Sequence, residues 1–239
     1  PVVPGSTSLA DYMSGVWGCV GVMMALRQAE RSGQGQVVDI GLYESVFRLL
    51  DEIVPVYARL GVVRERMGAD VPAVVPHGHW CTGDGRWVAL ACSSDKMFDR
   101  LAQAMERPEL AGDGPYGTTA RRVAARDGVN AVVAAWVGGL DYAALMAACD
   151  AFGVPCGPIN SIADIFAEPQ FEARGNMLHV DDPRVGPVVL PAGVPTLSET
   201  PPVLRHTGRA LGADTDSILG GLLGLDAAEI DHLRAVGAI

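Results

Sequence analysis

The sequence has no cluster of lysine and arginine residues. Its 239 residues include 18 Lys and Arg against 28 Asp and Glu, which gives a formal net charge of −10 at pH 7. A protein that binds nucleic acid without sequence preference needs a basic stripe that replaces the counterions of the phosphates. The charge balance therefore argues against nucleic acid as a partner.

Long uninterrupted apolar runs are also missing. The longest candidate, residues 16–26, is interrupted by glycines and is shorter than the roughly 20 residues that cross a bilayer. Residues 1–5 carry no charged segment of the kind that opens a secretory signal, and no apolar signal segment follows. We therefore expect a cytoplasmic protein without a membrane partner.

Cysteine pairs and the common site motifs are absent as well. The five cysteines are odd in number, form no CxxC motif and lie in apolar surroundings, a pattern typical of buried, reduced thiols in the cytoplasm: Cys19, Cys81, Cys92, Cys149 and Cys156. No P-loop, H-E-x-x-H or G-x-S-x-G motif occurs. His77 and His79 lack a third ligand nearby, so we predict no metal site.

What is present is a helix signal with a carboxylate at its start. Ser8-Leu9-Ala10-Asp11 fits a capping box, so Ser8 is expected to cap a helix that runs to about Arg31. An acidic residue in a first turn ordinarily complements the helix dipole. The alternative is a carboxylate nucleophile kept ionised by the helix N-terminus. Spacing alone favours the first interpretation.

Glycine recurs every third position along one side of this helix, at Gly15, Gly18 and Gly21. Each glycine costs a helix up to ~1 kcal/mol relative to alanine. The stripe therefore indicates the close approach of another backbone or of a ligand. Gly33 is a natural helix end, and Gly33-Gln34-Gly35 lies between a helix and a strand, the reverse of the dinucleotide-binding order.

The remaining sequence predicts short helices and strands. Asp181 and Asp182 precede a proline in a turn, so we expect both to be solvated. The expected elements are a strand at 37–40, a helix at 42–60 kinked by Pro55, hairpin strands at 79–82 and 86–91, helices at 95–105, 118–137 and 141–152, a short apolar segment edged by prolines at 154–159, a helix from 161, paired strands at 176–180 and 187–190, and helices at 214–223 and 227–236.

Two motifs near the N-terminus carry a family resemblance. They are Leu9-Ala10-Asp11-Tyr12-Met13-Ser14-Gly15 and, after the glycine-studded helix, Ser32-Gly33-Gln34-Gly35-Gln36-Val37-Val38-Asp39. Weaker matches follow in order at 82–85, 87–90, 107–110, 153–158 and 222–226. The sequence resembles the class III CoA-transferases over essentially its whole length. That family includes formyl-CoA transferases, carnitine CoA-transferases and the related α-methylacyl-CoA racemases.

The resemblance implies an α/β fold with a large parallel-sheet CoA-binding domain and a small α+β domain, interlocked as a dimer in the full-length enzyme. Residues 1–60 would then be the C-terminal part of the large domain, with the catalytic aspartate. Residues 61–75 would be a linker, 76–190 the small domain, and 191–239 a return linker with terminal helices on the large domain.

The resemblance also implies a site. Asp11 matches the catalytic aspartate, which attacks an acyl-CoA thioester and passes CoA to an acceptor acid through aspartyl anhydride and aspartyl-CoA intermediates. Acyl-CoA and a carboxylic acid are the implied substrates, with no tightly bound cofactor. Gly15, His77, Gly78 and His79 are expected at the substrate. The last three occupy the place of a mobile glycine-rich loop, although only one glycine is present.

Family members are considerably longer than this chain, and the half before the aspartate supplies most of the CoA-binding sheet. We therefore expect this chain alone neither to bind CoA well nor to turn over, and we expect a homodimer or a second chain that carries that half. Two alternatives remain, a racemase and a non-catalytic assembly module. The segment Tyr12–Gly15 lacks the Phe-x-Gly-Gly pattern of racemases, and 91–95 has the transferase form, so both favour the transferase.

Overall fold

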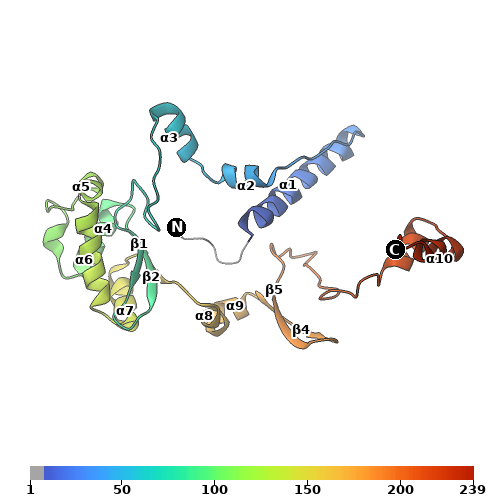
Figure 1. Cartoon of the computed structure of the whole chain (residues 1–239). Helices are drawn as coiled ribbons and strands as arrows, with labels where there is room; N and C mark the ends of the chain where they lie inside the picture. The colour runs from blue at the N-terminus through green and yellow to red at the C-terminus, as the bar shows by residue number, and fades with distance from the viewer. Residues whose placement is uncertain (1–7) are drawn as a thin grey trace. The chain divides into compact units, whose positions relative to one another are not determined.

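A computed structural model describes residues 8–239 (Figure 1). The expected absence of a secretory signal concerns residues that lie outside this described part. The chain divides into two units, one up to Ile159 and one from Asn160 onward. Each unit is described by itself.

The first unit begins with helices and continues into a small antiparallel sheet in the order β1-β2-β3, with helices against it (Figure 1). The predicted hairpin is confirmed. The elements are α1 (Leu9–Ser32), α2 (Leu42–Arg48), α3 (Ile53–Leu60), β1 (His77–Cys81), β2 (Trp87–Ala91), α4 (Asp95–Ala104), the 3-10 turn η1 (Pro108–Leu110), α5 (Thr119–Ala124), α6 (Arg126–Gly138), α7 (Tyr142–Phe152) and β3 (Cys156–Pro158).

The hydrophobic core of this unit lies between the sheet and α4, α6 and α7. Val88 and Leu90 alternate with more exposed residues along β2 and are buried, as expected for a strand with one covered face. On α6, Val129, Val133 and Val137 recur every fourth residue and are all buried, which places them on one side of the helix. The core thus follows from ordinary strand and helix periodicity.

The cysteines follow the predicted burial only in part. Cys92 and Cys149 are buried, and Cys156 is partly exposed. The prediction that the cysteines are buried is wrong for Cys19 and Cys81, which are exposed.

Arg122 on α5 is the largest fully buried side chain of the described residues. Its guanidinium donates to the carbonyl oxygens of Val75 (2.7 Å) and Tyr116 (3.0 Å). It also donates to the Asp95 carboxylate (3.0 Å) and the Thr119 hydroxyl (3.0 Å). A buried charge is tolerated when it is paired and hydrogen-bonded, and this arginine connects the segment before β1 with α4 and α5.

The prediction of a strand at 37–40 is wrong. These residues form no strand, because a strand needs a ladder partner and none of residues 8–239 pairs with them. The apolar side chains that suggested a strand instead contact α1. Ile40 approaches Gly18, and Val38 approaches Gly21.

The predicted single helix at 42–60 is also wrong, because the chain leaves helical geometry between α2 and α3. Asp51 has a φ of +43°, in the left-handed region that a right-handed helix cannot include. Pro55 lies in the first turn of α3, where its missing N–H costs the helix no hydrogen bond. The break therefore comes from Asp51, and the proline does not kink a continuous helix.

Replacing Gly117 by alanine should destabilise the first unit. Gly117 is buried, and a Cβ at this position would overlap the carbonyl of Gly112. Because both partners are backbone, relief requires a backbone shift, and we expect a loss of about 1–3 kcal/mol in the free energy of unfolding. Urea unfolding followed by tryptophan fluorescence measures it. Gly157→Ala is the control, since a Cβ there meets nothing within 4 Å; equal losses in both variants would contradict the prediction.

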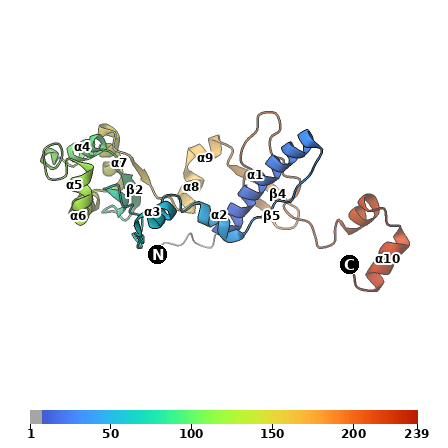
Figure 2. The same ribbon diagram turned by 90° about the horizontal axis from the view of Figure 1, so that it is seen from above.

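The second unit contains an antiparallel pair and short helices (Figure 2). Its elements are α8 (Ile162–Ala167), α9 (Pro169–Ala173), β4 (Met177–Asp182), β5 (Gly186–Pro191), the π-helical turn η2 (Ser217–Leu222) and α10 (Ala227–Ala235). The helix predicted at 214–223 is thus only partly helical. The predicted pairing of the two strands is confirmed, with Val180 opposite Val188. The assignment of 76–190 to one small domain stays a prediction.

Asp182 is not the solvated turn residue that the sequence predicts. Its side chain is 2% exposed and accepts hydrogen bonds from the backbone N–H groups of Arg184 (2.8 Å) and Val185 (3.2 Å) and from the Thr207 hydroxyl. These donors, Thr207 first, lower the pKa of Asp182 to about 2. The carboxylate therefore joins the β4–β5 turn to a segment 25 residues later.

Asp182→Asn should weaken folding in a pH-dependent way. The folded-state pKa of about 2 lies below the ordinary 3.8, so the stabilisation by the carboxylate is present above pH 4 and is lost as the pH falls toward 2. The difference in free energy of unfolding between wild type and variant should shrink over this range. Urea unfolding followed by circular dichroism at several pH values measures it. Asp181→Asn is the exposed control. A difference that stays constant from pH 5 to pH 2 would contradict this assignment.

Candidate functional site

Asp11 lies in the first turn of α1 and is exposed. The helix begins where the sequence predicts, but the predicted capping box does not form. Ser8 makes no side-chain capping bond, and its carbonyl accepts the N–H of Tyr12 at 3.1 Å. Capping therefore does not occupy the Asp11 carboxylate, which faces solvent close to the unpaired N–H groups of a helix start.

The three glycines of α1 have different neighbours. A Cβ at Gly18 would lie 3.8 Å from the Cδ1 of Ile40, and one at Gly21 would lie 3.0 Å from the Cγ1 of Val38. A Cβ at Gly15 would meet nothing within 4 Å. Gly15 follows Asp11 by four residues, so the two share a face of the helix. Side chains of the segment after α1 thus lie against the glycine stripe at Gly18 and Gly21, whereas the space at Gly15, on the same face as the Asp11 carboxylate, is open.

A hydroxyl pair connects α1 to α2 near this carboxylate. The Ser14 Oγ donates to the Ser45 Oγ at 2.9 Å, and Ser45 is 3% exposed. Neither serine is among the site residues predicted from the sequence. Ser14 lies inside the Leu9–Gly15 motif, three residues after Asp11, and that position was an available signal. The sequence around Ser45 holds no comparable signal, because a serine in a helix is ordinarily exposed.

His77, Gly78 and His79 belong to strand β1, where they pair with residues 89–91. The Nδ1 of His77 lies 2.8 Å from the Ala69 carbonyl oxygen, Gly78 is buried, and His79 is exposed. The segment is therefore a strand of a sheet and not a glycine-rich loop. The hydrogen bonds and ion pairs of residues 8–239 join neither Asp11 nor Gly15 to it, so its role at the substrate stays a prediction.

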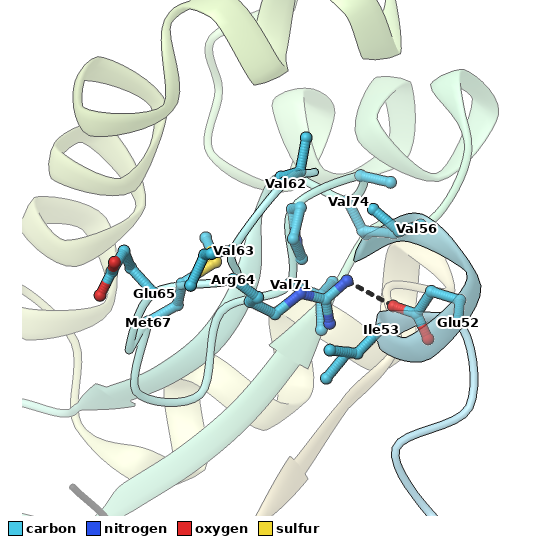
Figure 3. A pocket seen from close by; sticks show the side chains of 12 residues that line it. Glu52, Ile53, Val56, Val62, Val63, Arg64, Glu65, Met67, Val71 and Val74 are labelled. Atoms are coloured by element: carbon cyan, nitrogen blue, oxygen red, sulfur yellow. Dashed lines mark hydrogen bonds and ion pairs between the residues drawn. The ribbon is translucent and has the colours of Figure 1, made fainter. Parts of the chain in front are cut away.

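An apolar cavity of 760 Å³ lies between α3 and the segment at 62–74 (Figure 3). Valine side chains dominate its lining, among them Val56, Val63 and Val71. Arg64 forms an ion pair with Glu52 at 2.5 Å and so fastens the predicted linker to α3. None of the lining residues belongs to α1, and within residues 8–239 no group of three or more His, Cys, Asp or Glu is placed to hold a metal ion.

The surface of α1 is unusually apolar. None of its residues is buried, and Tyr12, Val16 and Met24 are more than half exposed. By length and composition this helix could cross a membrane, so the lack of long uninterrupted apolar runs does not exclude a membrane span, and the absence of a membrane partner stays a prediction. A core helix of a soluble protein has the same properties. Whether α1 is a membrane span or a core helix, lipid or another part of a protein must cover its apolar side chains.

Residues 1–215 match CoA-transferase family III. The chain belongs to this family. The family III chain is 48% identical over 235 residues to the alpha subunit of succinyl-CoA–L-malate CoA-transferase from Chloroflexus aurantiacus, covering 98% of this chain and 55% of that subunit. It is 46% identical over 237 residues to the beta subunit, covering 98% of this chain and 58% of that subunit.

A solved structure gives the same result for the fold. A CAIB/BAIF family protein from Brucella suis is 29% identical to the family III chain, with a TM-score of 0.73 over 93% of this chain and 57% of that one. The predicted class III CoA-transferase fold is thus confirmed. The family III chain spans about half the length of the curated relatives it matches. Accordingly, the pairings among its described strands are antiparallel, and the expected parallel sheet is not among them.

Proposed function

We propose that the enzyme to which this chain contributes moves CoA from an acyl-CoA to a carboxylic acid, with Asp11 as the nucleophile. The observation that carries this proposal is the exposed Asp11 carboxylate beside the open position at Gly15, in a chain that belongs to a family of CoA-transferases. The relatives named above act on succinyl-CoA and L-malate. We therefore propose short dicarboxylic acids as donor and acceptor.

The proposed reaction begins when an oxygen of the Asp11 carboxylate attacks the thioester carbonyl of the donor. The C–S bond breaks, CoA leaves as a thiolate, and an acyl-aspartyl anhydride forms. The thiolate then attacks the aspartyl carbonyl, which gives an aspartyl-CoA thioester and releases the donor acid. An acceptor carboxylate repeats both steps in reverse order and restores Asp11. Positioning and water exclusion supply most of the catalysis in such a sequence.

Electrostatics at the helix start support this role. The first-turn N–H groups of α1 have no intrahelical acceptor, and the helix dipole stabilises negative charge there. Donors of this kind stabilise an oxyanion as it develops on an attacked carbonyl. The Ser14–Ser45 bond would hold α1 against α2 while the substrate enters beside Gly15.

We also propose that another part of the family fold packs on α1. The chain spans about half the length of its relatives, and the apolar surface of α1 fits packing against the remainder of the family fold better than a bilayer, because Asp11 needs access to polar substrates. We propose a cytoplasmic dimer, in which the second subunit is either identical or related, since the chain resembles both an alpha and a beta subunit. The CoA-contacting residues would then lie mostly outside this chain.

Trapping with hydroxylamine tests the proposal. The native enzyme that contains this chain is mixed with succinyl-CoA, hydroxylamine is added, and peptides that contain Asp11 are examined by mass spectrometry. A transferase gives an Asp11 hydroxamate, because hydroxylamine attacks the anhydride or thioester. Exchange of an α-proton with deuterium, without any hydroxamate, would instead establish the racemase alternative.

A further inference from the structure

The chain after α1 turns back and runs along the glycine stripe of that helix. A Cβ at Gly21 would lie 3.0 Å from the Cγ1 of Val38, and one at Gly18 would lie 3.8 Å from the Cδ1 of Ile40. As the segment advances by two residues, its contact on α1 moves back by three. The segment is therefore antiparallel to α1, and it delivers α2 beside the start of that helix (Figures 1 and 2).

Helix α2 continues this run with a contact one turn nearer to the helix start. The Ser14 Oγ donates to the Ser45 Oγ at 2.9 Å, and Ser45 is the buried residue of α2, so its face of α2 is turned toward α1. Arg48 follows Ser45 by three residues and shares that face. Asp11 precedes Ser14 by the same interval. Three residues rise about 4.5 Å on either helix, so the antiparallel run brings Arg48 to the level of Asp11.

The charge of Arg48 is available to a ligand. Arg48 is exposed, and none of the hydrogen bonds and ion pairs of residues 8–239 involves its side chain. The nearby carboxylates have other partners, since Glu44 accepts a backbone N–H at the start of α2 and Glu52 pairs with Arg64. A last-turn arginine also complements the helix dipole, an effect worth a few tenths of a kcal/mol. That effect does not require the face toward Asp11.

We propose that Arg48 recognises the second carboxylate of a dicarboxylic substrate. This role rests on the proposed function, because it needs an acyl group bound at Asp11. When the thioester carbonyl of succinyl-CoA lies at Asp11, the other end of the acyl group carries a free carboxylate. A guanidinium presents paired N–H donors that match the two oxygens of a carboxylate. L-malate has the same two carboxylates, so one arginine serves both donor and acceptor.

Arg48 and Asp11 are not ion-paired with each other within the described chain. A direct pair would occupy both groups and make the Asp11 carboxylate a weaker nucleophile. Without it, Asp11 can attack at one end of the substrate while Arg48 binds the other end. A monocarboxylic acid of the same length would leave the guanidinium without a partner, and a site that binds a polar group discriminates strongly against an analogue that lacks it. Arg48 is therefore a specificity-determining residue.

Comparison of two acceptors tests this role. The native enzyme that contains this chain transfers CoA from unlabelled succinyl-CoA either to carbon-13 succinate or to butyrate, which has a methyl group in place of one carboxylate. We expect wild type to prefer succinate. Arg48→Gln should reduce the ratio of the two kcat/KM values at least about tenfold, through a higher KM for succinate, with butyrate within about twofold of wild type. Arg48→Lys keeps the charge and should keep most of the preference.

Arg59→Gln is the matched control, because Arg59 is an exposed arginine in the last turn of α3. Its preference should stay within about twofold of wild type. An unchanged preference in Arg48→Gln, or equal losses with succinate and butyrate, would overturn the role of Arg48. The hydroxylamine product at Asp11 separates this result from the proposed function. An Arg48 variant that forms it and keeps its preference refutes the arginine alone, whereas its absence in wild type refutes the nucleophile.

Discussion

Asp11→Asn in the native enzyme that carries this chain should lower CoA transfer by about 10³-fold or more. Asparagine has nearly the same size, so folding and substrate binding should persist. Its amide is a poor nucleophile, so neither the anhydride nor the aspartyl thioester forms. The rate of CoA exchange between succinyl-CoA and L-malate measures the effect, and the hydroxylamine product at position 11 should disappear with it.

Asp127→Asn is the matched control for this loss. Asp127 is an exposed carboxylate in the first turn of α6, so its replacement removes the same helix-dipole interaction without touching the proposed nucleophile. We expect CoA transfer within about twofold of wild type, since a surface interaction of this kind is worth a few tenths of a kcal/mol. Equal activity in the Asp11 variant and the Asp127 variant would mean that Asp11 only stabilises its helix.

Arg122→Met should be the most damaging single substitution in the small antiparallel sheet and its helices. Methionine fills much of the same volume but leaves the carbonyl oxygens of Val75 and Tyr116 without their donor. Unsatisfied buried acceptors and a broken ion pair with Asp95 together predict a loss of about 3 kcal/mol in the free energy of unfolding. Urea unfolding followed by tryptophan fluorescence measures it.

Arg121→Met provides the comparison at the neighbouring position. Arg121 is exposed and donates to the carbonyl oxygens of Asp113 and Gly114, where water can replace it. We expect a change of about 0.5 kcal/mol or less. If both arginine variants lose the same stability, the buried contacts of Arg122 do not hold this part of the fold together.

The local sequence pattern was enough to predict the elements whose stabilising contacts are formed by residues close in the sequence. The hairpin of β1 and β2 follows from its turn glycines and alternating strands, and α1 follows from a run without proline that ends at Gly33. The strand predicted at 37–40 failed because pairing depends on a distant partner. The single helix predicted at 42–60 failed for a related reason. It is broken at Asp51, and a left-handed backbone conformation is selected by the surroundings of a residue as much as by its identity.

The candidate site was predictable in part. The catalytic role predicted for Asp11 depends on the family motif, since its position in a first helical turn, taken alone, favours a structural role. The burial of Asp182 depends on Thr207, 25 residues away, and the burial of Arg122 depends on Val75, 47 residues away. Polar residues of this kind look like surface residues in a sequence, because the groups that satisfy them are far along the chain.

The open position at Gly15 also bears on which acids the proposed enzyme accepts. A carbonyl carbon under attack must come within about 3–3.5 Å of the carboxylate oxygen, and its acyl branch must then pass along the helix face one turn below. Because no atom of the described chain, apart from the adjoining turns of α1 itself, stands within 4 Å of a Cβ at Gly15, the missing methyl group at this position would set the clearance for substituents next to the carbonyl. The helix that supplies the nucleophile would thereby also select substrates by their width.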